Sequence, residues 1–384
     1  MRPDAFFMDM ALDLAQMGVG YTSPNPVVGA VVVNDGEVVG RGFHRRAGEP
    51  HAEVIALEEA GERAKGATLY VTLEPCCHWG RTGPCAERVV SSGISRVVVA
   101  MVDPNPRVAG GGIALLRQSG VEVSVGLGKE RAAWLNEPFI KFILTGRPLV
   151  VLKWAMTLDG RIASRLGASK WITSMPAREE VHRMRTRYDA VLVGRTTVER
   201  DDPELTVRHC EGRDPLRVIL DSHGRVPPGA RCLPGAVVAT AGAPPERARE
   251  LERRGAEVLR LPPEDGRVAW NPLLEILAGR GITSVLVEGG SEVAASALKA
   301  QVVDKVAAFV APRILGGASA LGPVGGEGAT DPGEATQLVI AGVDALGGDL
   351  LIEAYVKNST IYGFYEGEGI SVVHRHCGRD GKGI

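Results

Sequence analysis

Short runs of almost entirely apolar residues alternate with helical patterns along most of this chain. In the first half such runs lie at 27–33, 37–43, 67–74, 95–102 and 121–125. Because strands this apolar need cover on both faces, the alternation predicts an α/β unit with helices on each side of a sheet. The first two runs flank Asn34-Asp35-Gly36, which is typical of a tight hairpin turn.

Apolar spacing and start signals predict the helices of this half. In the first helix the i, i+3, i+4 spacing predicts a buried stripe made of Phe7, Met10, Ala11, Leu14 and Met17. Further helices are expected near His51, at Pro84, which suits the first position of a helix, and at 129–144.

A second α/β run follows Gly146-Arg147-Pro148, so we expect two domains, 1–146 and 147–357. Its predicted strands are 149–155, 189–193, 216–220, 236–240, 256–260, 283–288, 303–311 and 349–356, and its predicted helices 176–187, 245–254, 271–280 and 290–299. A glycine-rich loop is expected at 315–334, and residues 358–384, which lack periodicity, are expected to be a disordered tail.

Composition narrows the class of protein. The 384 residues carry a formal net charge of −2, which disfavours a protein that binds the phosphates of nucleic acid. No run approaches the ~18 apolar residues of a membrane span, and Asp4, Asp9 and Asp13 interrupt the segment where a signal peptide would be apolar. Six irregularly spaced cysteines indicate reduced thiols, so a cytoplasmic enzyme is expected.

The strongest chemical signal is His51-Ala52-Glu53 followed by Pro75-Cys76 and, nine positions later, Cys85. One imidazole and two thiolates suit zinc and leave a fourth position for water, whose pKa zinc lowers to ~7. Glu53 would be free to take a proton from that water and pass it to a departing amine. This pattern is close to the H-x-E…P-C-x-x-C signature of zinc deaminases, except that eight residues separate the two cysteines.

The longer spacing leaves alternatives open. Cys77 is a competing ligand, although its side chain should point away from that of Cys76, and the loop places His78 and Arg81 at the mouth of the pocket. The same residues could also be buried thiols and a capping histidine without metal. Cys210 and Cys232 are interpreted as ordinary thiols. His374, His376 and Cys377 resemble a small metal cluster, but they fall in the expected tail.

Long motifs in both halves resemble the bifunctional deaminase/reductase family of riboflavin biosynthesis. In the first half they are PNPVVGAVVV at 24–33, RGFHRRAGEPHAE at 41–53 and LEPCCHWGRTGPC at 73–85. In the second they are KWAMTLDGRIA at 153–163, SKWITS at 169–174, DAVLVGRTTVERDDPELTVR at 189–208, LVEGG at 286–290 and APRILGG at 311–317. The resemblance covers about residues 4–356, in order.

The resemblance implies a cytidine-deaminase-like three-layer α/β/α domain followed by a dihydrofolate-reductase-like α/β domain. It implies zinc-dependent hydrolysis of an amino group from 2,5-diamino-6-(5-phosphoribosylamino)pyrimidin-4-one, and then NADPH-dependent reduction of the ribosyl group to ribityl. The expected partner is this small pyrimidine ribosyl phosphate, with no nucleic acid and no membrane, and the chain is expected to form a homo-oligomer, a dimer or a tetramer, through its reductase half.

The resemblance also implies roles for individual residues. In the first domain zinc would lie on His51, Cys76 and Cys85, with Glu53 as the proton carrier and the substrate near Asn25, His44, His78, Asp103 and Asn105. In the second, NADPH would lie near Ala155, Trp171, Thr197, Asp201, Ser222, Gly290 and Ser291, and the substrate near Ser169, Arg185, Leu205, Arg208 and Glu288.

Some of these assignments also have a physical argument. The amide of Asn25 can donate to and accept from a pyrimidine edge, although it could instead cap a turn between two prolines. The guanidinium forks of Arg185 and Arg208 suit a sugar phosphate. The second half lacks the G-x-G-x-x-G fingerprint, but Gly289-Gly290-Ser291 opens a predicted helix and could bind a cofactor phosphate.

Two other functions remain possible from the sequence. A zinc deaminase acting on a base in nucleic acid would share the His-x-Glu and Pro-Cys elements, and its binding would weaken steeply with salt. A non-catalytic domain that keeps zinc only as a structural pin would need a closed site with four protein ligands.

Overall fold

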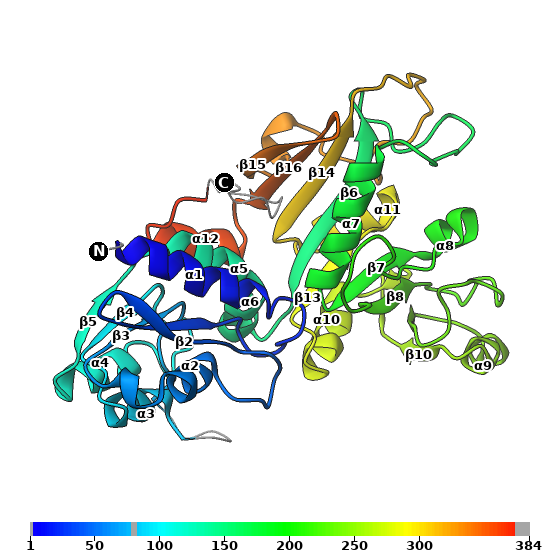
Figure 1. The fold of residues 1–384 in the computed structure, drawn as a ribbon. Helices are drawn as coiled ribbons and strands as arrows, with labels where there is room; N and C mark the ends of the chain where they lie inside the picture. Colours follow the sequence, from blue (N-terminus) through cyan, green and yellow to red (C-terminus); the bar gives the residue numbers. More distant parts are fainter. Residues whose placement is uncertain (1–2, 78–82, 373–384) are drawn as a thin grey trace. The chain divides into compact units, whose positions relative to one another are not determined.

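A computed structural model describes residues 3–77 and 83–372 of the chain. The chain divides into two compact units, Met1–Gly146 and Arg147–Ile384 (Figure 1). Each unit contains its own sheet with helices packed against it, and each is described by itself below.

The sheet of the first unit has five strands in the order β2-β1-β3-β4-β5. β1 (Gly29–Asn34) and β2 (Glu37–Phe43) form the predicted hairpin, with the turn at Asp35 and Gly36 in the left-handed region at φ 50° and 79°. β3 (Thr68–Val71) pairs antiparallel with β1, whereas β4 (Arg96–Val99) and β5 (Glu122–Val125) continue the sheet in parallel.

α1 (Asp4–Gln16) and α2 (Ala52–Ala60) lie on opposite faces of this sheet, and glycines let both approach closely. A Cβ at Gly29 would lie 1.9 Å from the carbonyl oxygen of Ala11 in α1, and one at Gly42 would lie 2.3 Å from that of Ala52 in α2. Gly42 pairs with the residue after Gly29, and neighbouring strand residues face opposite ways, so the two helices form separate layers.

The buried stripe of α1 differs from the predicted one. Phe7, Met8, Ala11, Leu12 and Ala15 are buried, whereas Met17 is 59% exposed. Met10 and Leu14 are only half-buried. The apolar spacing is compatible with both the predicted and the observed stripe, which share Phe7 and Ala11. The close packing of Ala11 and Ala15 on β1 selects the observed stripe.

The other helices of this unit are η1 (Gly61–Ala64), α3 (Cys85–Ser91), α4 (Gly111–Gln118), α5 (Lys129–Leu135) and α6 (Glu137–Thr145). The helix predicted at 129–144 is therefore two helices. The break lies at Asn136, whose side-chain Oδ1 accepts a bond of 2.8 Å from Val27 N and whose Nδ2 donates to Val27 O at 3.0 Å.

The second unit is built on a nine-stranded sheet in the order β10-β9-β8-β7-β13-β6-β14-β16-β15. All eight predicted strands are present, as β6 (Leu149–Thr157), β7 (Ala190–Gly194), β8 (Leu216–Leu220), β9 (Val237–Thr240), β10 (Glu257–Arg260), β13 (Ser284–Val287), β14 (Lys305–Ala311) and β16 (Asp349–Val356). The pairs are parallel except those of β16 with its two neighbours.

The four predicted helices are α7 (Met175–Arg187), α9 (Pro245–Arg253), α10 (Trp270–Gly279) and α11 (Ser291–Lys299). Several elements were not predicted, among them α8 (Arg195–Asp201), the hairpin of β11 (Pro263–Glu264) and β12 (Arg267–Val268), and the edge strand β15 (Leu338–Leu346). A register irregularity between Ile340 and Gly342 interrupts the alternation of β15, which hides it from a period-two search. A short turn, η2 (Pro332–Glu334), precedes it.

The expectation of a disordered tail from residue 358 is wrong as far as residue 372. α12 (Thr360–Gly367) begins where Ser359 Oγ accepts a bond from Tyr362 N. Ile361 and Tyr365 are fully buried, and the Tyr365 ring lies 5.3 Å from that of Tyr355 in β16. Ile361, Phe364 and Tyr365 follow helical spacing, but they span only two turns, which is too short a signal to detect. His374, His376 and Cys377 lie outside the described residues.

No helix in the described part of the chain is long and apolar enough to cross a membrane.

Candidate functional site

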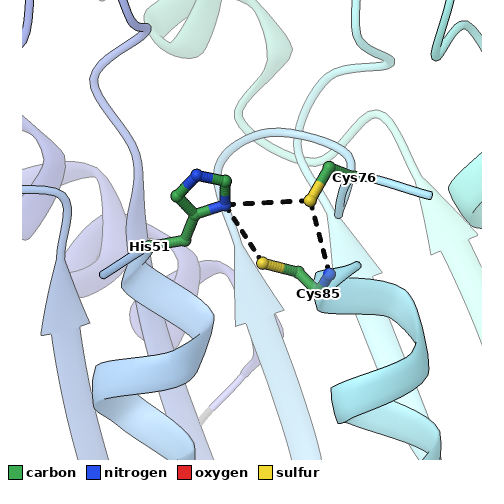
Figure 2. Close-up of side chains that lie close together, drawn as sticks. All are labelled: His51, Cys76 and Cys85. Atoms are coloured by element: carbon green, nitrogen blue, oxygen red, sulfur yellow. Dashed lines mark hydrogen bonds between the residues drawn. The ribbon is translucent and has the colours of Figure 1, made fainter. Parts of the chain in front are cut away.

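Three elements of the first unit bring His51, Cys76 and Cys85 together (Figure 2). His51 precedes α2, Cys76 follows β3, and Cys85 begins α3. His51 Nδ1 lies 3.1 Å from Cys85 Sγ and 3.7 Å from Cys76 Sγ, and Cys85 N donates to Cys76 Sγ at 3.3 Å. All three ligand atoms lie within 4.8 Å of one another, so one ion can contact them together.

The electrostatics of the cluster favour a thiolate. Hydrogen bonds from Cys85 and His51 lower the pKa of Cys76 to about 4, and the bond with Cys76 together with burial raises the pKa of Cys85. The hydrogen bond to Cys76 raises the pKa of His51. A thiolate is the form of cysteine that ligates metals, so Cys76 is shifted toward its ligating form, whereas His51 and Cys85 would release their protons when a metal binds.

The donor set fits zinc, which favours a nitrogen and sulfur shell of this kind. Cys77 does not join the cluster: its Sγ lies 2.8 Å from the position that a Cβ on Gly111 would occupy, as expected from a side chain that points away from Cys76. Among the described residues no other histidine, cysteine or carboxylate joins the three ligands. His78 and Arg81, predicted at the pocket mouth, lie outside the described residues.

Glu53 lies in the first turn of α2, two residues from His51, and is 3% exposed. Burial raises the pKa of its carboxyl, which also bonds with the thiol of Cys85. A carboxyl group held next to the cluster with a raised pKa is suited to accept a proton and to return it.

His44 and Asn25 form one wall beside the cluster. The buried ring of His44 lies with its centroid 5.5 Å from that of His51, its Nδ1 is 3.1 Å from Pro50 O, and its Nε2 is 3.0 Å from Asn25 Nδ2. Burial lowers the pKa of His44, which favours the neutral ring. A neutral ring that donates from Nδ1 must accept at Nε2 from the Asn25 amide, which directs the Asn25 oxygen elsewhere.

Asp103 and Asn105 lie on the loop that follows β4. Asp103 Oδ1 accepts from Asn105 N at 2.8 Å, and Asn105 Oδ1 accepts from Arg107 N at 3.1 Å. The backbone N–H of Asp103 donates to Glu74 Oε2 at 3.1 Å. Glu74 precedes Pro75-Cys76, so this loop is tied directly to the segment that carries one of the zinc ligands.

In the second unit, Arg185 of α7 and Glu288, which follows β13, form a buried bidentate ion pair with bonds of 2.7 and 2.9 Å. Arg185 Nη1 also donates to Thr206 O at 2.9 Å. The fork of Arg185 is thus engaged by the carboxylate of Glu288, which is itself one of the residues expected near the substrate. The more exposed Arg208 contacts Glu204 and Thr206 through its Nη1.

Lys153, in the middle of β6, points toward the same carboxylate. Its Nζ lies 3.9 Å from Glu288 Oε2, and burial lowers the pKa of this lysine. Although burial alone would raise it, the charges of Arg185 and Lys153 lower the pKa of Glu288 to about 2. Burial and Arg185 together lower the pKa of the neighbouring His182 to about 4.

A second group surrounds α8. Ser169 Oγ donates to Asp201 Oδ1 at 2.9 Å, and Lys170 Nζ donates to Asp201 O at 2.8 Å. The next residue, Trp171, is 61% exposed, and the guanidinium of Arg178 lies 4.3 Å from its ring centroid. The structure thereby joins Ser169 and Asp201, which the family resemblance had assigned to substrate and cofactor respectively.

The starts of α8 and α11 lie side by side, because they follow the neighbouring parallel strands β7 and β13. Gly290 caps α11 without a side-chain bond, and Thr197 Oγ1 of α8 lies 3.6 Å from where a Cβ on Gly290 would be. A Cβ on Gly194, before α8, would lie 2.6 Å from Val293 of α11. The arrangement fits an anion such as a cofactor phosphate, because first-turn N–H groups of a helix attract negative charge.

The remaining predicted residues of this unit occupy separate places. Ala155 is on the same face of β6 as Lys153, and Ser291 is the first residue of α11. Ser222 follows β8, and its Oγ accepts from Val268 N at 3.3 Å. Leu205 is buried with a left-handed φ of 59°.

Sequence reasoning did not single out two buried charged groups, Lys153 and Glu74. A lysine within the otherwise apolar run LVVLKWAMT was the available signal for Lys153, because a buried charge needs a partner. For Glu74 the signal was a carboxylate at the end of the apolar strand before Pro75-Cys76.

Comparison with known families agrees with this geometry. The family described as "RibD C-terminal domain" matches residues 148–352, and "Cytidine and deoxycytidylate deaminase zinc-binding region" matches residues 1–101. The zinc-binding match contains all three cluster ligands, His51, Cys76 and Cys85.

Similar proteins cover nearly the whole chain. The riboflavin biosynthesis protein RibD of Aquifex aeolicus is 46% identical over 326 residues, 84% of this chain and 90% of that protein, and the Escherichia coli protein of the same name is 44% identical over 331 residues, 82% of this chain and 89% of that protein. A solved Acinetobacter baumannii RibD structure has 40% identity and a TM-score of 0.81 over 92% of this chain and 98% of that one. A Thermotoga maritima deaminase/reductase structure has 39% identity and a TM-score of 0.80 over the same shares. The chain therefore belongs to the RibD family, the bifunctional deaminase/reductases of riboflavin biosynthesis.

Proposed function

We propose that the first unit hydrolyses the amino group of 2,5-diamino-6-(5-phosphoribosylamino)pyrimidin-4-one, with zinc held by His51, Cys76 and Cys85. The observation that carries this proposal is the buried carboxyl of Glu53 beside a compact imidazole and dithiol cluster. When bound there, zinc would supply hydroxide at neutral pH by lowering the pKa of water to ~7.

The residues of the chain supply proton transfer and orientation. Glu53 accepts a proton from the attacking water and delivers it to the departing amine, which leaves as ammonia. Its raised pKa helps it to hold that proton between the two transfers. Neutral His44 orients Asn25, whose amide contacts the pyrimidine edge, and the loop of Asp103 and Asn105 lines the pocket.

Glu53→Gln tests this assignment, because glutamine keeps the size of the side chain and cannot carry the proton. We expect ammonia release to fall by roughly 10²–10⁴-fold, with zinc content and reduction of the deaminated product unchanged. Glu58→Gln, an exposed carboxylate on the same helix, is the matched control. Ammonia release by Glu53→Gln at the wild-type rate would refute the role of Glu53.

In the second unit, NADPH reduces the ribosyl group of the aminouracil product to ribityl. The paired starts of α8 and α11, with Thr197, Gly290 and Ser291, support a site for its phosphates. The hydride comes from the cofactor, so the protein has to align donor and acceptor and exclude water. Lys153 and Glu288 supply the buried charges on the face of β6 that also carries Ala155.

Asp201 is assigned to this site because its carboxylate holds Ser169 and its carbonyl holds Lys170, next to Trp171. In Asp201→Ala we expect kcat/KM for NADPH oxidation to fall roughly 10–100-fold, the effect of losing a hydrogen bond to a charged group. Asp202→Ala, which removes the neighbouring pair with Arg231, should have little effect. Unchanged NADPH turnover in Asp201→Ala would remove that residue from the site.

The proposal extends to self-association through the reductase unit. Leu338, Ile340 and Val343 on the edge strand β15, and Leu350 on β16, are 40–57% exposed. The pairing of Val343 with Ile352 and of Ala345 with Leu350 places them on one face. A second copy of the chain would cover this apolar face in a dimer or a tetramer.

Light scattering after gel filtration tests the association. Val343→Lys should reduce the assembly to monomers, whereas Val125→Lys, on the edge strand β5 of the other sheet, should not. A wild-type protein that is monomeric at micromolar concentration would contradict the proposed dimer.

The use of NADPH and the free thiols of the described cysteines favour the cytoplasm as the compartment of the enzyme.

A further inference from the structure

Glu74 is a buried carboxylate with three backbone partners and no role yet in the chemistry. It is 3% exposed. Its Oε2 accepts from Asp103 N at 3.1 Å and from Gly110 N at 2.9 Å, and its Oε1 accepts from Ile113 N at 3.1 Å. All three donors come from one stretch, 103–113, which contains the substrate loop and the start of α4.

These bonds replace the cap that α4 lacks. No side chain of α4 or its N-cap residue Gly110 caps the helix, and Ile113 is in the first turn, where N–H groups have no partner within a helix. A carboxylate at this end also interacts favourably with the helix dipole. The start of α4 is therefore completed by a residue that lies 36 positions earlier in the chain.

The backbone next to Glu74 is also closely packed against α4. A Cβ on Gly112 would lie 1.9 Å from Pro75 O, so only glycine lets α4 approach the Pro75-Cys76 segment. Glu74 N also donates to Met101 O at 3.0 Å, which joins the ends of β3 and β4. The zinc-ligand segment and the substrate loop are thus connected through one residue.

We infer that Glu74 is a positioning residue for the deamination: its carboxylate holds the Asp103–Asn105 loop and the start of α4 against the Pro75-Cys76 segment, and thereby fixes the pocket wall relative to the zinc ligands. This inference rests on the proposed deaminase function. It goes beyond that function by assigning the pocket geometry to a side chain that contacts neither zinc nor substrate.

The test is Glu74→Gln in the zinc-loaded full-length protein. An amide can accept through only one atom, and its NH₂ group would face an N–H donor. We expect kcat/KM for deamination to fall roughly 10–100-fold, mainly through KM, because small displacements of positioning groups have effects of this size. Zinc content and reduction of the deaminated product should stay at wild-type values. Glu59→Gln is the matched control, since Glu59 also accepts from a backbone N–H, that of Arg41, but is exposed.

Hydrogen exchange gives a second readout. In the wild-type protein the amides of Gly110 and Ile113 should exchange much more slowly than that of Arg107, whose hydrogen bond to Asn105 is exposed. In Glu74→Gln, exchange within 103–113 should accelerate while α2 remains protected. If the variant does not fold, the wild-type protection pattern still decides whether the carboxylate of Glu74 holds the amides of Gly110 and Ile113.

Three results would overturn the inference. They are wild-type kcat/KM in Glu74→Gln, loss of zinc from that variant, which would place the effect on the metal ligands, and fast wild-type exchange at Gly110 and Ile113. Absence of deamination in the wild-type protein would instead refute the proposed function. Hydrogen exchange alone would then test whether Glu74 holds the 103–113 stretch.

Discussion

At the scale of single residues, the two units bury their charges in different ways. The cluster of His51, Cys76 and Cys85 holds one thiolate beside an imidazole, and the nearby carboxyl of Glu53 has a raised pKa. In the second unit the carboxylate of Glu288 is matched by two buried cations and its pKa is lowered. A proton carrier needs the first environment, and a permanent charge needs the second.

The lowered pKa of Glu288 has a consequence for stability. Its value of about 2 in the folded chain lies below the ordinary value of 4.5, so the ion pair stabilises the second unit above pH ~4.5, and this contribution is lost as the pH falls toward 2. The loss amounts to about 3 kcal/mol, from ~1.4 kcal/mol for each pH unit of the shift.

Urea unfolding between pH 6 and pH 3, followed by hydrogen exchange in β6 and β13, measures this contribution. The free energy of unfolding of wild-type protein should fall more steeply with acid than that of Glu288→Gln. Glu264→Gln, an exposed carboxylate in the same unit, should follow the wild type. Equal slopes for wild type and Glu288→Gln would show that Glu288 titrates normally.

At the scale of elements, the positions of the proposed site residues depend on how closely helices approach strands. His51 and Glu53 lie at the start of α2, and β2 admits that helix only because it has glycines facing it. A Cβ on Gly40 would lie 2.1 Å from Ala56 O. The position of His51 and Glu53 therefore depends on Gly40 and Gly42, which lie in a different segment of the chain.

Gly40→Ala should push α2 away from the sheet. We expect the first unit to lose about 1–3 kcal/mol of stability, the usual cost of overpacking, and deamination to fall while reduction is retained. Thermal unfolding and the two activity assays measure this. Gly279→Ala is the control, since a Cβ there meets nothing within 4 Å; equal deamination by Gly40→Ala and the control would contradict the account.

The last helix is a second test at this scale. Tyr365→Ala should destabilise the second unit by about 3–5 kcal/mol, as for other buried aromatic residues, because Tyr365 is fully buried against Tyr355. Glu366→Ala, an exposed neighbour, should leave stability unchanged. If chemical denaturation gives the same midpoint for both variants, α12 does not contribute to the fold.

Strands and helices with long apolar patterns could be predicted from the sequence, and so could the donor set of the zinc cluster. The buried stripe of α1 could not, because the deciding contact is between Ala15 and Gly29 in another element. β15 was missed because its alternation slips at Ile340, and α12 because its apolar spacing extends over only two turns. The partner of Arg185 was also beyond the sequence, since a guanidinium suits a carboxylate and a phosphate equally.

At the scale of the whole molecule, the two proposed reactions belong to two compact units of one chain. The first unit has the His51, Cys76 and Cys85 cluster with Glu53 as its proposed proton carrier, and the second has the proposed phosphate site at the starts of α8 and α11 and the buried pair of Arg185 and Glu288. Because each reaction has its own residues, either activity should survive the loss of the other.

One measurement tests this claim most directly: the product mass spectrum of purified zinc-loaded protein given the diaminopyrimidinone ribosyl phosphate, with and without NADPH. We expect amino-to-oxo exchange in both samples and a further gain of two hydrogens only with NADPH. If the substrate stays unchanged in both samples, or gains hydrogens while keeping its amino group, the assignment of the two reactions to the two units is contradicted.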